Sequence, residues 1–268
     1  MEFLKFSFLA IIQGLTKFLP VSSSGHLFII QNFFHISADK PLLLWLSIAN
    51  FLAVLFLFGS RIKKISQELW SMTVSFFRKR GIHVKQEKNE NGILGLKLIL
   101  ATICTIPTAL FFQKISLTFF RVRSVASLLL LSALIIVIAE QFKSDKKRNF
   151  SYLMAVFIGL VQGVSILPGL SRIGIGIAFL MLFGLEASLA TEIVFLLGAP
   201  LFLGQMIELF KEKTMWEWNV SNLSFAILCL GASIFAMSYL LKHIRKKWMY
   251  FAPYCALIGI ILLIFFDK

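Results

Sequence analysis

Long apolar segments, separated by short polar ones, constrain this chain more than any other feature. Each is as long, or nearly as long, as the ~20 apolar residues that cross the hydrocarbon core of a bilayer. Six segments have this character: 41–59, 93–113, 124–139, 188–210, 219–241 and 248–266. Only 15% of the 268 residues are charged, against about 25% in soluble domains, so too little polar sequence remains to cover a soluble core. We therefore predict an all-α polytopic membrane protein with six transmembrane helices, folded as a single membrane domain over residues 1–268.

Two further apolar stretches, 3–35 and 150–185, are interrupted near their middle by proline, glycine and serine. The interruptions read Pro20-Val-Ser-Ser-Ser-Gly25 and Pro168-Gly-Leu-Ser-Arg-Ile-Gly174. Unpaired backbone groups are costly in lipid, so irregular chain at membrane depth must be shielded by protein or must line a cavity. We predict that each stretch is a re-entrant helical hairpin with a tight turn near the middle.

The two hairpins also resemble each other in sequence. A Gln-Gly pair (Gln13-Gly14, Gln162-Gly163) precedes each proline, and a serine (Ser23, Ser171) follows it by three residues. Each hairpin is followed by three of the apolar segments, so we predict two repeats, 1–140 and 141–268. Because three spans is an odd number, the second repeat is inverted, an architecture that places sites near the bilayer midplane.

Basic residues set the expected orientation. Loops 60–92, 143–148 and 242–247 carry 8, 4 and 4 lysines and arginines, 16 in all, and the opposite face carries 8. The positive-inside rule makes the first face cytoplasmic and places both termini outside. We expect loop 60–92 to be a solvated basic loop, with a short amphipathic surface helix as the alternative. The net charge of +14 is then explained by anionic membrane lipids, and no basic domain suited to nucleic acid is predicted.

Polar side chains at membrane depth are functional candidates. The first hairpin offers Lys17, Ser22, Ser23, Ser24 and His26, and the second offers Ser171 and Arg172. A guanidinium beside free backbone N–H groups suits a phosphate oxygen. A serine within reach of a histidine is the minimum set for nucleophilic attack assisted by a base.

Each candidate also has a structural interpretation. Ser22–Ser24 could cap a helix, Lys17 could extend to the headgroups, and His26 could be a packed, hydrogen-bonded histidine. Gly174 and Gly176 could allow close helix packing. Cys104, Cys229 and Cys255 lie singly in different segments, which predicts packing residues and no metal cluster. The combination of polar groups on two opposed hairpins favours a site.

At these residues the chain resembles a known family. Gln13-Gly-Leu-Thr-Lys-Phe-Leu-Pro-Val-Ser-Ser-Ser-Gly-His-Leu27 and Pro168–Gly174 are similar to the two signature motifs of the bacterial undecaprenyl-pyrophosphate phosphatases of the bacitracin-resistance type. The stretch Ala190–Gly204 resembles the segment that follows the second motif.

The resemblance implies a hydrolase that removes the terminal phosphate of undecaprenyl pyrophosphate, which recycles the carrier lipid of peptidoglycan synthesis. It implies that Ser23 is the nucleophile, His26 its acid/base partner and Arg172 the pyrophosphate ligand. The site would open to the outer face of the bacterial inner membrane. We expect further substrate contacts from a second group of residues: Gln13, Lys17, Ser22, Ser24, Gly169 and Ser171. A homodimer is left open.

The chain departs from the family in both motifs. The family usually carries acidic residues, or one acid and one glutamine, where this chain has Gln13 and Lys17, and Ile173 and Gly176 replace a serine and a threonine. The family's acidic pair is linked to a divalent cation, so we expect Lys17, rather than a metal ion, to meet the phosphates here. The alternative function is a lipid-phosphate transporter or flippase, or a weakened binder of lipid pyrophosphates. Only the enzyme needs Ser23.

Overall fold

The computed structural model describes residues 2–77, 89–119, 121–142, 148–210 and 220–265. Within these ranges the chain is helical and contains no strand, which confirms the all-α class. The helices are α1 (Glu2–Phe18), α2 (Ser23–Phe34), α3 (Lys40–Phe77), α4 (Glu90–Ser116), α5 (Val122–Gln141), α6 (Tyr152–Val164), α7 (Arg172–Leu182), α8 (Ala187–Phe210), α9 (Val220–Lys247) and α10 (Phe251–Phe265), with short 3₁₀ turns η2 (Leu117–Phe119) and η4 (Trp248–Tyr250).

Both interrupted stretches fold as helix, turn and helix. The first contains α1 and α2, and the second contains α6 and α7. The returning helices α2 and α7 have 12 and 11 residues, fewer than the ~20 needed to cross a bilayer. The helix–turn–helix form predicted from the proline, glycine and serine interruptions is therefore present, and the re-entrance of both hairpins into the membrane stays a prediction.

Five stretches of the described chain are long and apolar enough to cross a membrane. One of them, Val220–Phe265, contains both α9 and α10, which follow each other with only η4 between them. The polytopic class is thus confirmed, and the count of six spans stays a prediction.

The prediction that the first span ends at residue 59 and continues as a loop is wrong. Helix α3 extends to Phe77, and residues 78–88 of the expected loop lie outside the described residues. The extension is held by α4, whose backbone approaches so closely at Gly95 that an added Cβ would lie 2.6 Å from the Leu69 side chain. Glu68 also accepts a hydrogen bond from the Gly92 amide (2.8 Å). Packing against α4 therefore maintains the helix where the apolar pattern ends.

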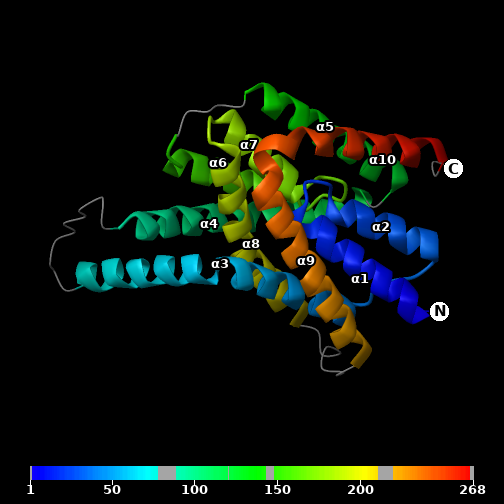
Figure 1. Cartoon of the computed structure of the whole chain (residues 1–268), viewed down its shortest axis with the longest axis horizontal. Coiled ribbons are helices and arrows are strands. Elements are labelled where there is room, and N and C mark those ends of the chain that lie inside the picture. Colours follow the sequence, from blue (N-terminus) through cyan, green and yellow to red (C-terminus); the bar gives the residue numbers. More distant parts are fainter. Residues whose placement is uncertain (1, 78–88, 120, 143–147, 211–219, 266–268) are drawn as a thin grey trace.

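Each hairpin packs against the other half of the chain. Helix α1 packs along α9, and α6 packs along α4. The glycine of each Gln-Gly pair makes the close contact: an added Cβ would lie 2.4 Å from the Cys229 carbonyl oxygen at Gly14 and 2.4 Å from the Thr108 Cβ at Gly163. The equivalent spans α5 and α10 lie side by side (Figure 1). This reciprocal exchange of partners is compatible with an inverted repeat, and the repeat itself, with its division at residue 140, stays a prediction.

The helix ends agree with the predicted orientation. The N-terminus and the end of α10 lie at one side of the molecule, and the end of α3 lies at the opposite side (Figure 1). The sidedness in a membrane is a prediction from the basic residues.

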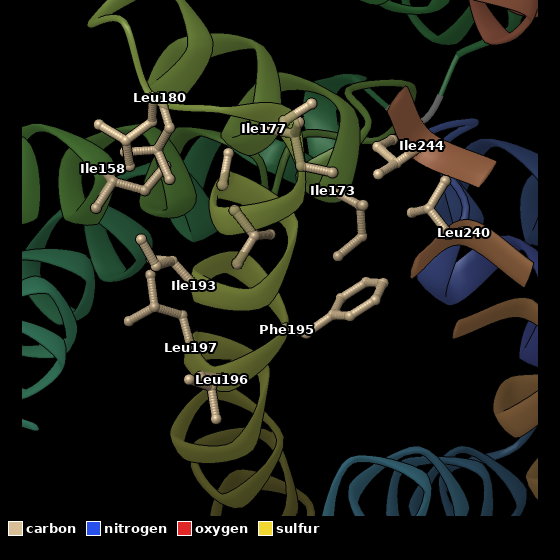
Figure 2. Close-up of a cluster of buried hydrophobic side chains, with 14 of the residues drawn as sticks. Ile158, Ile173, Ile177, Leu180, Ile193, Phe195, Leu196, Leu197, Leu240 and Ile244 are labelled. Carbon is tan, nitrogen blue, oxygen red and sulfur yellow. The ribbon is translucent and has the colours of Figure 1, made fainter. Parts of the chain in front are cut away.

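Helix α7 lies in the interior of the protein. The largest buried apolar cluster forms where α7 and α8 meet, and α9 adds Leu240 and Ile244 (Figure 2). Ile173, at the position of the family's serine, is 2% exposed and belongs to this cluster together with Phe195. Ile173 is therefore a core residue that fixes the start of α7, and Arg172 directly precedes it.

Candidate active site

Ser22 shapes the first turn. It precedes α2 as its N-cap, and its Oγ accepts a hydrogen bond from the Gly25 amide (3.3 Å). Its φ of 66° is unusual for a residue other than glycine, and such conformations persist only where the surrounding structure holds them. The capping interpretation is thus right for Ser22. Ser23 and Ser24 follow it, half-buried, in the first turn of α2.

The second turn is fixed to α5. Ser171 caps α7 by accepting from the Gly174 amide (3.1 Å), and its own amide donates to the Ser132 hydroxyl of α5 (3.1 Å). Gly169 has a φ of 104°, and an added Cβ would lie 2.5 Å from the Val125 carbonyl oxygen. Only glycine fits this position, because both the backbone conformation and the approach to α5 exclude a side chain.

The two turns share one local design. Ser22 and Ser171 are both N-caps that accept from a glycine amide three residues later. Counting from the prolines had paired Ser23 with Ser171, but the structure pairs Ser22 with Ser171. Ser23 and Arg172 are then equivalent, because each is the first residue of a returning helix. The nucleophile and the phosphate ligand implied by the resemblance occupy matching positions.

The tips of the two hairpins meet. An added Cβ at Gly25 would lie 3.6 Å from the Gly169 Cα, and one at Gly174 would lie 3.2 Å from the Pro20 Cβ. The start of α2 therefore contacts the second turn, and the start of α7 contacts the first turn. Free amide groups at helix N-termini favour anions, so this junction brings together two N-termini, those of α2 and α7, that both favour an anion.

Two cations lie against one aromatic ring beside this junction. The Arg172 Cζ lies 4.8 Å, and the Lys17 Nζ 5.5 Å, from the ring centre of Phe202 on α8. The Arg172 Nη2 is inaccessible and has no hydrogen-bond partner among the described residues. Two neighbouring positive charges without a bound anion repel each other. The pair is suited to an anion that contacts both side chains.

Two glutamines lie near these cations. The Oε1 atoms of Gln13 and Gln162 are both buried and lack a partner within the described part of the chain. Gln13 is one helical turn before Lys17, a spacing that places both side chains on one face of α1. The Gln162 Nε2 donates to the Arg172 carbonyl (3.4 Å), and it lies so close to Gly176 that an added Cβ there would be 2.5 Å away. Gly176 thus admits the glutamine that supports Arg172.

His26 is buried and has partners on both ring nitrogens. Its Nδ1 lies 2.8 Å from the Ser22 carbonyl oxygen, and its Nε2 lies 2.7 Å from the Tyr254 hydroxyl of α10. The two rings are nearly parallel, at 4°. Since both nitrogens are engaged in this way, the ring makes no hydrogen bond to Ser23, and the predicted serine–histidine pair, three residues apart in sequence, is not joined here.

The donor set does not suit a divalent cation. Hard cations take several oxygen ligands, with carboxylates among them. The unpartnered oxygen of Gln13 is on the same helix face as the cation Lys17, and the described residues contain no group of three or more His, Cys, Asp or Glu side chains that could hold a metal. Because the described residues of this site lack the carboxylates that a divalent cation prefers, the expectation that Lys17 takes the place of a metal rests on the residues that line it.

Sequence reasoning missed two residues of the site. Phe202 lies in the stretch that resembles the family, but nothing in the pattern indicated that its ring would contact both cations. Tyr254 lies in an apolar segment far along the chain and carried no signal.

The comparisons with known proteins agree on one family. The sequence model of the family described as bacitracin resistance protein BacA matches residues 6–261. The undecaprenyl-diphosphatase of Alkaliphilus metalliredigens is 33% identical over 269 residues, which cover 96% of this chain and 96% of the relative. That of Halothermothrix orenii is 33% identical over 272 residues, 98% of both chains. That of Thermosipho africanus is 32% identical over 256 residues, 94% of this chain and 96% of the relative.

Proposed function

Because this chain belongs to the family of the bacitracin resistance protein BacA, we propose that it hydrolyses undecaprenyl pyrophosphate to undecaprenyl phosphate and inorganic phosphate. Three relatives that align with nearly the whole chain are named undecaprenyl-diphosphatase. The product would return to peptidoglycan synthesis as the carrier lipid. The protein would act in the bacterial inner membrane, with its site open to the outer face.

The arrangement of Lys17 and Arg172 on the ring of Phe202 is the observation that carries this proposal. A pyrophosphate offers oxygens on two phosphorus atoms and several negative charges, so it can accept from both cations at once. The unpartnered Arg172 Nη2 gives one such donor, in the fork geometry that suits phosphate oxygens. Gly169, Ser171, Ser22 and Ser24 shape the surrounding turns.

Ser23 is the nucleophile in this proposal. Its Oγ attacks the terminal phosphorus, a Ser–O–P bond forms, and the bond from that phosphorus to the bridging oxygen breaks. Undecaprenyl phosphate leaves, and Arg172 and Lys17 stabilise the charge that develops on the oxygens. Water then attacks the phosphoserine, which releases inorganic phosphate and restores the hydroxyl.

His26 accepts the proton of Ser23 and later assists the water. Its Nδ1 already faces a carbonyl oxygen, which can only accept a hydrogen bond, so Nε2 is the nitrogen that can take a proton. That nitrogen faces Tyr254 in this structure.

The transporter alternative is not favoured, because the relatives are named as phosphatases.

Purified protein in detergent should release inorganic phosphate from a short-chain prenyl pyrophosphate. Ser23→Ala should lower the rate at least 100-fold, the scale of a lost catalytic group, while retaining substrate binding. Arg172→Ala should lower the rate and should also weaken substrate binding.

Two matched variants control for the substitutions themselves. Ser7→Ala changes a half-buried serine of α1 whose hydroxyl donates to the Phe3 carbonyl, and Arg121→Ala changes an exposed arginine without a side-chain cap bond. Both should keep normal turnover. A Ser23→Ala protein with full activity would refute the nucleophile, and a wild-type protein that binds but never releases phosphate would refute the enzyme.

A further inference from the structure

His26 is held between a carbonyl oxygen and a phenol. The carbonyl oxygen of Ser22 has no hydrogen to give, so the short contact of 2.8 Å requires a proton on Nδ1. In the neutral ring Nε2 then carries a lone pair, and the Tyr254 hydroxyl at 2.7 Å must donate to it. The two contacts together fix one tautomer of His26.

The phenol also suits the protonated ring. When Nε2 gains a proton, the hydroxyl of Tyr254 can rotate and accept from it, because a hydroxyl both donates and accepts. A buried polar group without a partner is costly, and this arrangement leaves neither charge state of His26 without one. The lone pair of Nε2 points at the Tyr254 oxygen, so the phenol is the hydrogen-bond partner of this nitrogen before and after it gains a proton.

The surroundings hold Tyr254 in place. It belongs to α10, which packs along α5, and the neighbouring Cys255 Sγ lies 3.5 Å from the Pro20 carbonyl oxygen of the first turn. The Tyr254 ring lies nearly parallel to the His26 ring, with their centres 5.7 Å apart. Two successive residues of α10 therefore contact the first hairpin, Tyr254 at His26 of α2 and Cys255 at the turn, and this packing positions the phenol against His26.

We propose that Tyr254 is a positioning residue for the phosphatase reaction, which fixes the His26 tautomer and stays hydrogen-bonded to Nε2 when His26 takes a proton from the attacking oxygen, first of Ser23 and then of water, and gives a proton to the leaving oxygen. This inference rests on the proposed function for its kinetic part. The tautomer and the hydrogen bond stand on geometry alone.

The first test is spectroscopic. Protein labelled with ¹⁵N-histidine is studied by NMR in detergent, and the His26 signals are assigned by their absence in His26→Gln. Wild-type protein should show a protonated Nδ1 and a hydrogen-bonded, unprotonated Nε2. Tyr254→Phe should shift the Nε2 signal toward that of a nitrogen without a donor. The same experiment on Tyr250→Phe, which changes a tyrosine that is 69% exposed, should leave the signals unchanged.

The second test is kinetic. Tyr254→Phe should lower kcat about ten-fold, the factor that matches one hydrogen bond, with KM within about two-fold, and Tyr250→Phe should keep both. Unchanged His26 signals or an unchanged kcat in Tyr254→Phe would overturn the proposal. A wild-type protein without phosphatase activity would refute the function, while the NMR signals still decide whether Tyr254 fixes His26.

Discussion

Lys17 should carry part of the affinity for the pyrophosphate. The side chain is half-buried on the last turn of α1, shares the Phe202 ring with Arg172 and has no carboxylate partner among the described residues. Lys17→Met removes the charge and keeps an apolar stem of similar length. Lys242→Met, on an exposed position of α9, makes the same change in net charge away from the site.

The size of the effect follows from the charges. A unit charge at ~4 Å from a phosphate oxygen contributes about 4 kcal/mol at an effective dielectric constant of about 20. Lys17 is only half-buried, and its removal also relieves repulsion with Arg172. About half of that value should remain, or about 2 kcal/mol, which corresponds to a loss of about 30-fold in kcat/KM.

The assay is phosphate release from a prenyl pyrophosphate by purified protein, with and without a chelator. Wild-type protein should keep its activity in chelator, and Lys17→Met should lose about 30-fold in kcat/KM under both conditions. Lys17→Glu restores a carboxylate beside Gln13, so its activity should require an added divalent cation. If wild-type protein lost all activity in chelator while Lys17→Met kept normal kinetics, Lys17 would have no role in binding.

Three further predictions concern the second turn, the cation pair and the orientation in the membrane. Gly169→Ala should lower the thermal unfolding temperature in detergent, because a φ of 104° and a carbonyl oxygen 2.5 Å from an added Cβ both oppose a side chain, whereas Gly231→Ala, with open space around it, should not. Phe202→Leu should lower kcat/KM about five-fold, since each cation–π contact contributes roughly 0.5–2 kcal/mol to holding the two side chains. A cysteine at position 64 should be labelled only from the cytoplasm and one at 213, outside the described residues, only from outside; labelling of both from one side would contradict the orientation.

The hairpins could be predicted because their signal is local. Proline, glycine and serine within an apolar stretch indicate a turn wherever they occur, and the resemblance then pointed to the same residues. The end of α3 could not be predicted in this way. Hydropathy declines after residue 59, but Glu68 and Leu69 continue the helix because α4 lies beside them. A contact between distant segments decided that boundary.

The same limit applies to the chemistry of the site. Sequence reasoning placed Ser23, His26 and Arg172 near one another, because their motifs lie on two hairpins. It could not find the Tyr254 phenol, which meets His26 across 228 residues of sequence.

The matching caps explain how one scaffold could provide two different functions. Ser22 and Ser171 make the same cap hydrogen bond, each accepting from a glycine amide three residues later, so each returning helix presents its remaining free amide groups at the junction of the hairpins. The residue after each cap then determines the role: a hydroxyl at Ser23 on one side and a guanidinium at Arg172 on the other. In the proposed reaction, a phosphate held by the guanidinium and the helix starts would lie next to the hydroxyl that attacks it. Exchanging the two residues would keep both caps and both helices, but it would move the cation away from the Phe202 ring, and we therefore expect a folded protein without phosphatase activity.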